Sequence, residues 1–517
     1  MELSRTENSI KNSGMAVFAH IISILLSFVG RTFFIKFLNV DYLGVNGLFT
    51  NILTILSLAE LGIGSAITYM MYSPIANGEH RKVAAYNFLF KRVYNTIGLI
   101  IFVIGLFIMP FLPDIIKGTP DISENLYIVY LLFLINTVSS YFFTYKRSLL
   151  IAHQKEYINS KNIVFFAIVK DIVLIVVLYV TTNFYFYLLA QIGITILSNI
   201  AISRKTDKLF PEIAKYKKEK VPKQELKVII RNTLAMLCHK IGSVIVSGTD
   251  SILISSFVGI ATVGVYSNYK LICYCLQQTT IKFTNSVTAS IGNLAVSADG
   301  DKVIAVFRKL YFINFTLAFF VSCFFYTLSN AFIKIWIGDS YLLDDACLLI
   351  ITIDLFIYQI RQPAIVIINA YGLFWPIKWK SIWEAVINLL VSLYLVIGLK
   401  LGILGVLLGT MISTLATNIW WEPFVAYRYG MRTKQKGYYK ELIKSFISFF
   451  IAIVILHFSV KYINGFVGIS LIMILLISAL VATFVLLVVY FLFYSRNEEF
   501  KYATKLLCSI GRNLLKK

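Results

Sequence analysis

The stretch GISLIMILLISALVATFVLLVVYFLFY, residues 468–494, contains no charged side chain. A helix needs about 20 predominantly apolar residues to cross the hydrocarbon core of a membrane. Thirteen similar stretches precede this one, so the sequence predicts an all-α polytopic membrane protein with fourteen transmembrane helices. The predicted spans lie near residues 14–38, 44–72, 86–112, 125–151, 160–181, 184–202, 232–257, 263–289, 309–336, 345–371, 378–400, 403–427, 441–463 and 468–494.

The composition of the whole chain agrees with this prediction. Of the 517 residues, 58% are hydrophobic and only 14% are charged, whereas roughly a quarter of the residues of a soluble protein are charged. The net charge of +22 would favour a nucleic-acid partner in a soluble protein. In a membrane protein it reflects the excess of Lys and Arg on the cytoplasmic side, so we expect no nucleic-acid partner.

The charges of the loops predict the orientation of the chain. The loop between spans 6 and 7, RKTDKLFPEIAKYKKEKVPKQELKVIIR, contains ten Lys or Arg, and the loops after spans 2, 4 and 12 are basic too. The loop between spans 3 and 4 instead carries Asp114, Asp121 and Glu124 against Lys117. Because basic loops stay on the cytoplasmic side, both termini are predicted to be cytoplasmic.

The sequence also indicates an internal duplication. Sliding the chain by 220 residues aligns 12–45 with 232–265 without a gap and pairs seven identical residues, among them Gly44 with Gly264. Six spans in each repeat is an even number, which gives parallel repeats related by an axis along the membrane normal. The sequence thus predicts two parallel six-helix lobes plus two extra C-terminal helices. The predicted parts are an N-terminal lobe (1–203), a basic cytoplasmic linker (204–231), a C-terminal lobe (232–427), and helices 13 and 14 with a basic tail (428–517).

The first helix of each predicted lobe carries a polar stripe. His20, Ser23, Ser27 and Arg31 recur at helical spacing, and Lys240, Ser243, Ser247 and Ser251 form the matching stripe, with Asp250 beside it. Lipid cannot satisfy such side chains, so we expect both stripes to face a water-filled cavity.

Charged residues inside the predicted spans point the same way. Each costs about 2.5–3.5 kcal/mol at mid-membrane on insertion scales, and a single one is equally well explained by a structural ion pair or by snorkelling. Among these charged residues are Arg31, Glu60, Lys170, Asp171, Lys240, Asp250, Lys270, Lys282, Asp354, Arg361 and Glu384. As a set they favour a cavity, and the excess of cations favours a ligand that carries phosphate. We expect Arg31, Lys240, Lys270 and Arg361 to bind it, and Glu60, Ser27 and Ser247 to line the same cavity.

Span 11 contains a second polar group. Glu384 and Asn388 lie four residues apart on one face, and Thr410 of span 12 and Asp250 of span 7 add further oxygen atoms. Such oxygens can coordinate Na⁺ or carry a proton, or they can form an interhelical hydrogen-bond cluster. We therefore expect Na⁺ or H⁺ as a possible coupling ion, and no other cofactor.

Two stretches carry a family resemblance: GRTFFIKFLNVDYLGVNGLFTNILTILSLAELGIGSAITYMMYSPIA (30–76) and NAYGLFWPIKWKSIWEAVINLLVSLYLVIGLKLGILGVLLGTMIST (369–414). The chain resembles the polysaccharide repeat-unit flippases of the multidrug/oligosaccharidyl-lipid/polysaccharide exporter superfamily. The resemblance implies a twelve-helix, two-lobe core with two additional helices, and alternating access without enzyme activity. It implies export of undecaprenyl-diphosphate-linked oligosaccharide through a bacterial cytoplasmic membrane, with membrane lipid, a polysaccharide polymerase and glycosyltransferases as partners.

The resemblance also implies roles for individual residues. The related lipid II flippases have cationic cavity residues and a sodium site built from helices 7, 11 and 12. Arg31 corresponds to the cation of the first helix. Asp250, Asn388 and Thr410 correspond to the sodium site, and Glu384 stands where an acid would assist it.

Other functions remain open at this point. A drug or metabolite exporter of the same superfamily is the nearest one, although cationic drugs would favour an acidic cavity. A membrane polysaccharide polymerase would require a large external loop, and an acyltransferase a placed His. His20, His239 and His457 lie in or near spans but have no motif around them.

Overall fold

The computed structural model describes residues 5–57, 63–216, 221–222, 225–226, 248–297, 300–433, 435, 437–465, 470–501 and 504. These residues form helices and turns and contain no strand, which confirms the all-α prediction. Eleven helices among them are long and apolar enough to cross a membrane. The count of fourteen transmembrane helices stays a prediction.

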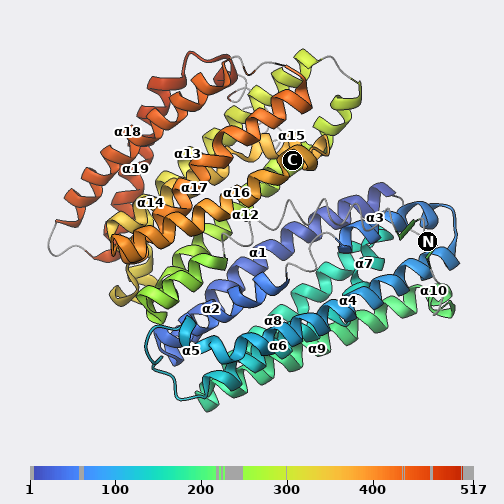
Figure 1. Ribbon diagram of the computed structural model, residues 1–517. Helices are drawn as coiled ribbons and strands as arrows, with labels where there is room; N and C mark the ends of the chain where they lie inside the picture. The colour runs from blue at the N-terminus through green and yellow to red at the C-terminus, as the bar shows by residue number, and fades with distance from the viewer. Residues whose placement is uncertain are drawn as a thin grey trace. The chain divides into compact units, whose positions relative to one another are not determined.

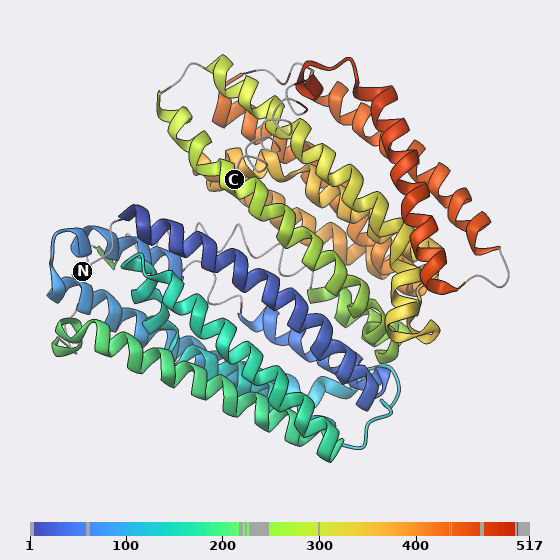
Figure 2. The same ribbon diagram turned by 180° about the vertical axis from the view of Figure 1, so that it is seen from behind.

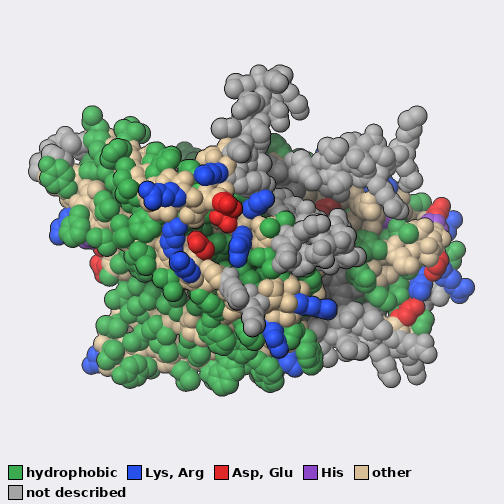
Figure 3. All heavy atoms as spheres, turned by 90° about the horizontal axis from the view of Figure 1, so that it is seen from above, with side chains coloured by type: hydrophobic (Ala, Val, Ile, Leu, Met, Phe, Trp, Pro, Cys, Tyr) green, Lys and Arg blue, Asp and Glu red, His purple; other side chains and the backbone are tan. Residues whose placement is uncertain are grey.

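The surface of these helices is suited to lipid. Along α19 (Leu471–Tyr494), Leu480, Phe484 and Leu492 are 71%, 70% and 77% exposed and recur on one face. On the face in Figure 3, hydrophobic side chains cover broad areas, whereas Lys, Arg, Asp and Glu gather in limited regions. Apolar patches of this extent are rare on soluble monomers, so these faces contact lipid.

The chain divides into two compact units, Met1–Gly264 and Val265–Lys517. In the first unit, α8 packs against both α1 and α9, and these helices run side by side in Figures 1 and 2. The helices of this unit are α1 (Arg5–Phe37), α2 (Val40–Leu56), α3 (Ile63–Ala76), α4 (His80–Ile108), α5 (Leu112–Ile115), α6 (Leu126–Tyr141), α7 (Thr144–Ala152), α8 (Glu156–Thr181), α9 (Phe184–Leu209) and α10 (Pro211–Lys215).

Three helices of the first unit begin with the same kind of cap. The side-chain oxygen of an Asn accepts hydrogen bonds from the first backbone N–H groups of the helix, which stabilises the start by about 1 kcal/mol. The buried carboxylate of Glu124 joins two of these starts, because it accepts from the Tyr42 hydroxyl and from the Phe184 backbone N–H. The caps are Asn39 of α2, Asn125 of α6 and Asn183 of α9.

In the second unit, α18 and α19 pack against each other and both pack against α13. Figure 1 shows α18 and α19 side by side in orange and red. The helices here are α12 (Ile260–Ser297, which starts in the first unit), α13 (Gly300–Ile337), α14 (Asp345–Ile360), α15 (Gln362–Ala370), α16 (Phe374–Leu393), α17 (Gly402–Val425), α18 (Tyr438–Asn464) and α19. One π-helical turn (Tyr394–Gly398) follows α16, and another (Ala426–Met431) follows α17.

The helix boundaries repeat along the chain. The helices α6 and α7 have 16 and 9 residues, and α14 and α15 also have 16 and 9. The starts of α2 and α12, of α8 and α16, and of α9 and α17 are each about 220 residues apart. This agreement supports the predicted duplication. The predicted limits of the lobes stay a prediction, because residues 227–247 lie outside the described part of the chain.

The break within each of these pairs has its own physical cause. Pro363 near the start of α15 lacks an N–H and disfavours a continuous helix before it. Between α6 and α7, Ser139 and Ser140 instead donate to backbone carbonyls three residues earlier, which bends a helix.

Glycines matched by the 220-residue offset pack together in the first unit. A side-chain carbon at Gly44 would overlap the carbonyl oxygen of Ile260, and one at Gly264 would overlap the carbonyl oxygen of Val40. Val40 and Ile260 are themselves separated by the same offset, so the contact is reciprocal, as a two-fold relation between the two segments produces. Nearby, Asn51 Nδ2 donates to Ser251 Oγ at 2.8 Å.

The predicted linker returns to α4. Glu225 accepts a hydrogen bond from the Tyr86 hydroxyl, and Lys82 Nζ lies 2.9 Å from its other oxygen. These contacts, the Tyr86 hydrogen bond first, lower the pKa of the Glu225 carboxyl. This part of the linker is therefore held on α4 while Glu225 is ionised.

Candidate functional site: a buried ion cluster in the second unit

Four charged side chains meet where α15, α16 and α17 pack together. Arg361, between α14 and α15, donates from Nε to Glu422 Oε2 at 2.8 Å, and its Nη2 lies 2.5 Å from Glu422 Oε1. This bidentate geometry is the strongest arrangement of an arginine and a carboxylate. Because the Arg361 side chain is only 12% exposed and that of Glu422 2%, the pair lies away from water.

Lys380 of α16 completes the cluster. Its Nζ lies 3.0 Å from Glu422 Oε1 and 3.2 Å from Glu384 Oε2. The amide of Asn418 donates to the other oxygen of Glu384. Each carboxylate oxygen thus has a cationic or amide partner, and the two cations balance the two anions.

The sequence of α16 and α17 explains this arrangement. Lys380 and Glu384 lie four residues apart, as do Asn418 and Glu422, so each pair shares one helix face. The two helices can approach closely because Gly409 of α17 has no side chain. A side-chain carbon at this position would overlap Ser392 Oγ of α16. The close approach excludes water, and the charged groups must therefore satisfy one another.

Farther along the same helix pair, Asn388 Nδ2 donates to Thr410 Oγ1 at 2.8 Å. The structure therefore brings together three of the four predicted sodium ligands, Glu384, Asn388 and Thr410, along α16 and α17. The fourth, Asp250, is buried in the first unit. Among the described residues, no group of three or more His, Cys, Asp or Glu could hold a metal ion. The sodium site stays a prediction.

Three of the other predicted site residues lie in the described part of the chain. Arg31 is half-buried on α1 within electrostatic range of Tyr187 of α9. Lys270 is exposed on α12, with Nζ 5.1 Å from the centre of the Tyr266 ring. The Ser27 hydroxyl donates to the backbone of its own helix. Three further predicted residues, Glu60, Lys240 and Ser247, lie outside the described part of the chain.

Sequence reasoning missed three members of the cluster: Lys380, Asn418 and Glu422. A signal was present for two of them, because Lys380 precedes Glu384 by one helical turn and Glu422 is an acid within a predicted span. Nothing in the sequence indicated that Glu422 pairs with Arg361, which is 61 positions away. The predicted docking role of Arg361 stays a prediction, and in this structure its guanidinium is occupied by a carboxylate.

A second arginine, half-buried and also missed, lies in the first unit. Arg147 of α7 donates from Nη1 to Asn159 Oδ1 at 2.6 Å and from Nη2 to Asn199 Oδ1 at 3.1 Å. Its Nη2 also lies 3.3 Å from Ser198 Oγ. Within the described residues, no carboxylate pairs with Arg147, and the buried Nδ2 of Asn199 has no hydrogen-bond acceptor. Among the described residues, the partners of this arginine are therefore neutral amides and a hydroxyl.

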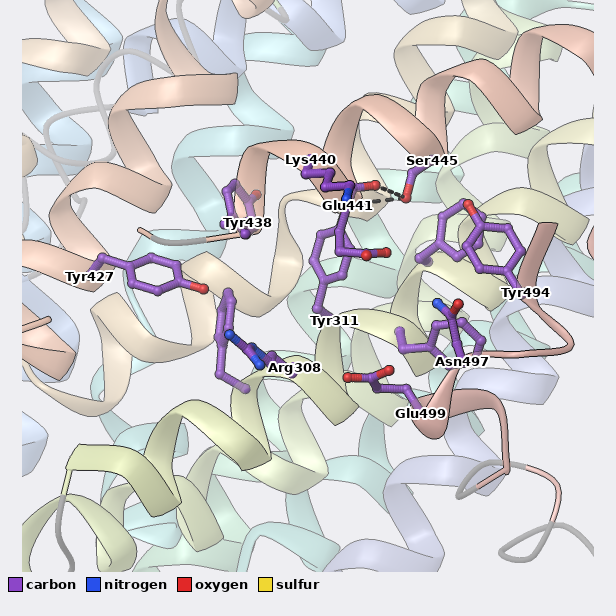
Figure 4. A pocket seen from close by; sticks show the side chains of 14 residues that line it. Arg308, Tyr311, Tyr427, Tyr438, Lys440, Glu441, Ser445, Tyr494, Asn497 and Glu499 are labelled. Carbon is purple, nitrogen blue, oxygen red and sulfur yellow. Dashed lines mark hydrogen bonds between the residues drawn. The ribbon is translucent and has the colours of Figure 1, made fainter. Parts of the chain in front are cut away.

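The second unit also contains a cavity of about 180 Å³ between α13, α18 and the end of α19. Its wall is largely aromatic, with Tyr311 and Tyr494 among the rings. In Figure 4, Arg308 and Glu499 lie on one side and Glu441 with Ser445 on the other. The cavity is distinct from the ion cluster, because the two share no residue.

No protein-family model and no curated protein sequence matches this chain. Solved structures do. A lipid II flippase, MurJ, in an inward closed conformation has a TM-score of 0.64 and 16% identity, and the match covers 94% of this chain and 99% of that one. An inward-facing multidrug resistance MATE family transporter of the MOP superfamily has a TM-score of 0.60 and 15% identity, over 78% and 94%. A Vibrio cholerae MATE transporter, VcmN, has a TM-score of 0.55 and 14% identity, over 83% and 98%.

These matches show that the chain has the fold of the MOP superfamily transporters. The share of this chain that each match covers differs between the lipid II flippase and the MATE transporters. Residues 438–517, which include α18 and α19, make up roughly a sixth of the chain. A match over 94% of the chain must include part of that region, whereas matches over 78–83% leave out about as many residues as it contains. The lipid II flippase therefore accounts for more of this chain than the MATE transporters do.

Proposed function

We propose that this protein is a flippase that moves undecaprenyl-diphosphate-linked oligosaccharide across the bacterial cytoplasmic membrane by alternating access. The observation that carries the proposal is the match to a lipid II flippase over 94% of the chain, which must include part of the region after residue 437. The resemblance of residues 30–76 and 369–414 to repeat-unit flippases supports the same substrate class. Both termini are proposed to be cytoplasmic, with polysaccharide polymerase and glycosyltransferases as partners.

The proposed mechanism begins with electrostatic docking. The diphosphate binds cations of the first unit, where Arg31 lies on the polar stripe of α1 and the described partners of Arg147 are neutral. Lys240 and Lys270 are proposed to contribute from the second lobe. Arg361 is the weakest docking candidate, because a phosphate would have to displace Glu422.

The driving force follows from the charge of the substrate. A membrane potential that is negative inside favours outward movement of each negative charge by about 2.3 kcal/mol per 100 mV. A diphosphate carries two such charges through the membrane. The polyprenyl tail remains in lipid, so only the polar head crosses the protein.

A drug or metabolite exporter is the second candidate, because a multidrug resistance transporter shares the fold. The match to that transporter covers 78% of this chain, which is less than the 94% covered by the lipid II flippase. It also predicts an acidic cavity, whereas the charged residues predicted within the spans include more cations than anions.

The test of the proposal is loss of the gene in its host. A flippase defect causes lipid-linked oligosaccharide units to accumulate on the cytoplasmic face of the membrane. Accumulation on the outer face would instead indicate a polymerase, and no accumulation together with drug sensitivity would indicate an exporter. Normal translocation by Arg31→Ala protein would remove the docking role of that residue.

A further inference from the structure

We propose that the Lys380 ammonium group is a built-in cation that permanently fills a monovalent-cation site between α16 and α17. Removing this side chain, without refilling the space, opens the site to Na⁺ or to a small ammonium ion. The intact protein has no need of sodium at this place.

The carboxylates around Lys380 have the geometry of a cation site in which the cation, the Lys380 ammonium group, is covalently attached to the protein. Carboxylate oxygens from two helices, Glu384 Oε2 and Glu422 Oε1, converge on Lys380 Nζ at 3.2 and 3.0 Å. Oxygen ligands are those that hard metal cations select. The side chains of Lys380, Glu384 and Glu422 are 6%, 9% and 2% exposed, so water does not compete for these oxygens.

The charge balance of the cluster prevents Na⁺ from binding while Lys380 is present. With Arg361 and Lys380 present, the two carboxylates are neutralised within the cluster. A sodium ion added to this arrangement would leave one uncompensated positive charge in a buried place, which is strongly unfavourable. Without Lys380, one negative charge is uncompensated instead, and an external cation restores the balance.

The neighbouring polar groups allow a substitute cation to be held. The Asn418 amide already donates to Glu384, and its oxygen accepts from the Thr417 hydroxyl at 3.5 Å. Shortening Lys380 to Ala removes four side-chain heavy atoms and leaves room for an ion with water. Replacing it with Met removes the charge but keeps the space filled.

This pair of substitutions provides the experiment. We expect Lys380→Ala to lower the melting temperature of the purified protein in choline chloride, and NaCl at the same ionic strength to restore much of the loss. The melting temperature should rise with the logarithm of the Na⁺ concentration from about 1 to about 300 mM, as for a ligand that binds only the folded state. Methylammonium should act in the same way. Lys380→Met should lose stability without responding to either cation.

Two controls separate the site from general salt effects. Lys378→Ala removes the same side chain from the same helix, but Lys378 is half-buried with its Nζ 3.5 Å from the centre of the Trp375 ring, so no cation response is expected. The double variant Lys380→Ala with Glu384→Gln restores the charge balance. It should be more stable than Lys380→Ala and should not respond to Na⁺, and it keeps the test available if the single variant does not fold.

The outcomes are decisive in both directions. Wild-type protein that is specifically stabilised by Na⁺ over choline overturns the proposal, and so does Lys380→Ala protein that responds no more than Lys380→Met. The consequence for transport rests on the proposed function: translocation by the wild type should be equal in Na⁺ and choline. The melting measurements do not depend on the substrate, so failure of the flippase assignment and failure of this proposal are distinguishable.

Discussion

The pair α6–α7 of the first unit and the pair α14–α15 of the second have the same lengths, and each holds an arginine, but the partners of the two arginines differ. Arg147 of α7 has amide and hydroxyl partners, whereas Arg361 before α15 has a bidentate carboxylate. Among the described residues, the partners of Arg147 are neutral, whereas Arg361 is paired with an anion. The comparison teaches that two arginines within predicted spans can differ in how far the described part of the fold compensates their charge.

The most severe test of this comparison is Arg361→Gln. It leaves Glu422 with Lys380 as its single cationic partner, and breaking a buried ion pair from one side costs about 3–5 kcal/mol. Differential scanning calorimetry of the purified protein should show this loss of stability as a lower melting temperature. The double variant Arg361→Gln with Glu422→Gln should recover much of it. Equal losses for Arg361→Gln and Arg147→Gln would contradict the comparison.

The two halves can also be compared through the reciprocal glycines. Gly44→Ala and Gly264→Ala each place a methyl group against a backbone carbonyl, and overpacking of this kind costs about 1–3 kcal/mol. The reciprocal contact predicts similar losses for the two variants in thermal unfolding. Gly193→Ala in α9, where a side-chain carbon meets nothing within 4 Å, is the matched control and should be neutral or stabilising.

A smaller effect is expected for Arg147→Gln. The substitution removes charged hydrogen bonds to neutral acceptors, a loss of about 1.5 kcal/mol, and the new amide can replace some of them. Under the proposed function, translocation of the lipid-linked substrate falls as well. Arg147→Lys, which keeps the charge, should retain more transport than Arg147→Gln, and the reverse order would remove Arg147 from substrate binding.

The smallest loss of stability is expected when the neutral hydrogen bond between Asn388 and Thr410 is removed. Thr410→Val removes the hydroxyl that accepts from Asn388 at 2.8 Å, at a cost of about 1 kcal/mol in unfolding experiments. Thr483→Val is the control, because that exposed hydroxyl bonds only within its own helix, and it should change stability by less than about 0.5 kcal/mol. A larger loss for Thr410→Val than for Arg361→Gln would reverse the ranking of charged and neutral contacts.

The sequence predicted the all-α membrane fold, because hydropathy alone requires residues such as 471–494 to be helical in lipid. The fourteen predicted spans are confirmed only in part, as eleven helices of the described residues are long and apolar enough to cross a membrane. The sequence predicted the duplication only from residues 12–45 and 232–265. The helices α6 and α14, aligned end to end, share no identical residue, so only their apolar character and length preserve the repeat.

The candidate site was less accessible to sequence reasoning. Glu384, Asn388 and Thr410 were found because they interrupt apolar spans at helical spacing. The pairing of Arg361 with Glu422 depends on how α15 and α17 pack, and no local pattern encodes such a contact between distant residues. Arg147 was not predicted as a site residue, because it lies at the end of the predicted span 125–151, where cations are expected next to a basic cytoplasmic loop.

The central claim is tested most directly in proteoliposomes that contain the purified protein and a labelled undecaprenyl-diphosphate-linked oligosaccharide. The account predicts that the label crosses the bilayer faster than in protein-free liposomes, and faster still when a potential favours movement of negative charge in the export direction. Translocation no faster than in protein-free liposomes, accompanied by uptake or export of a cationic drug, would contradict it.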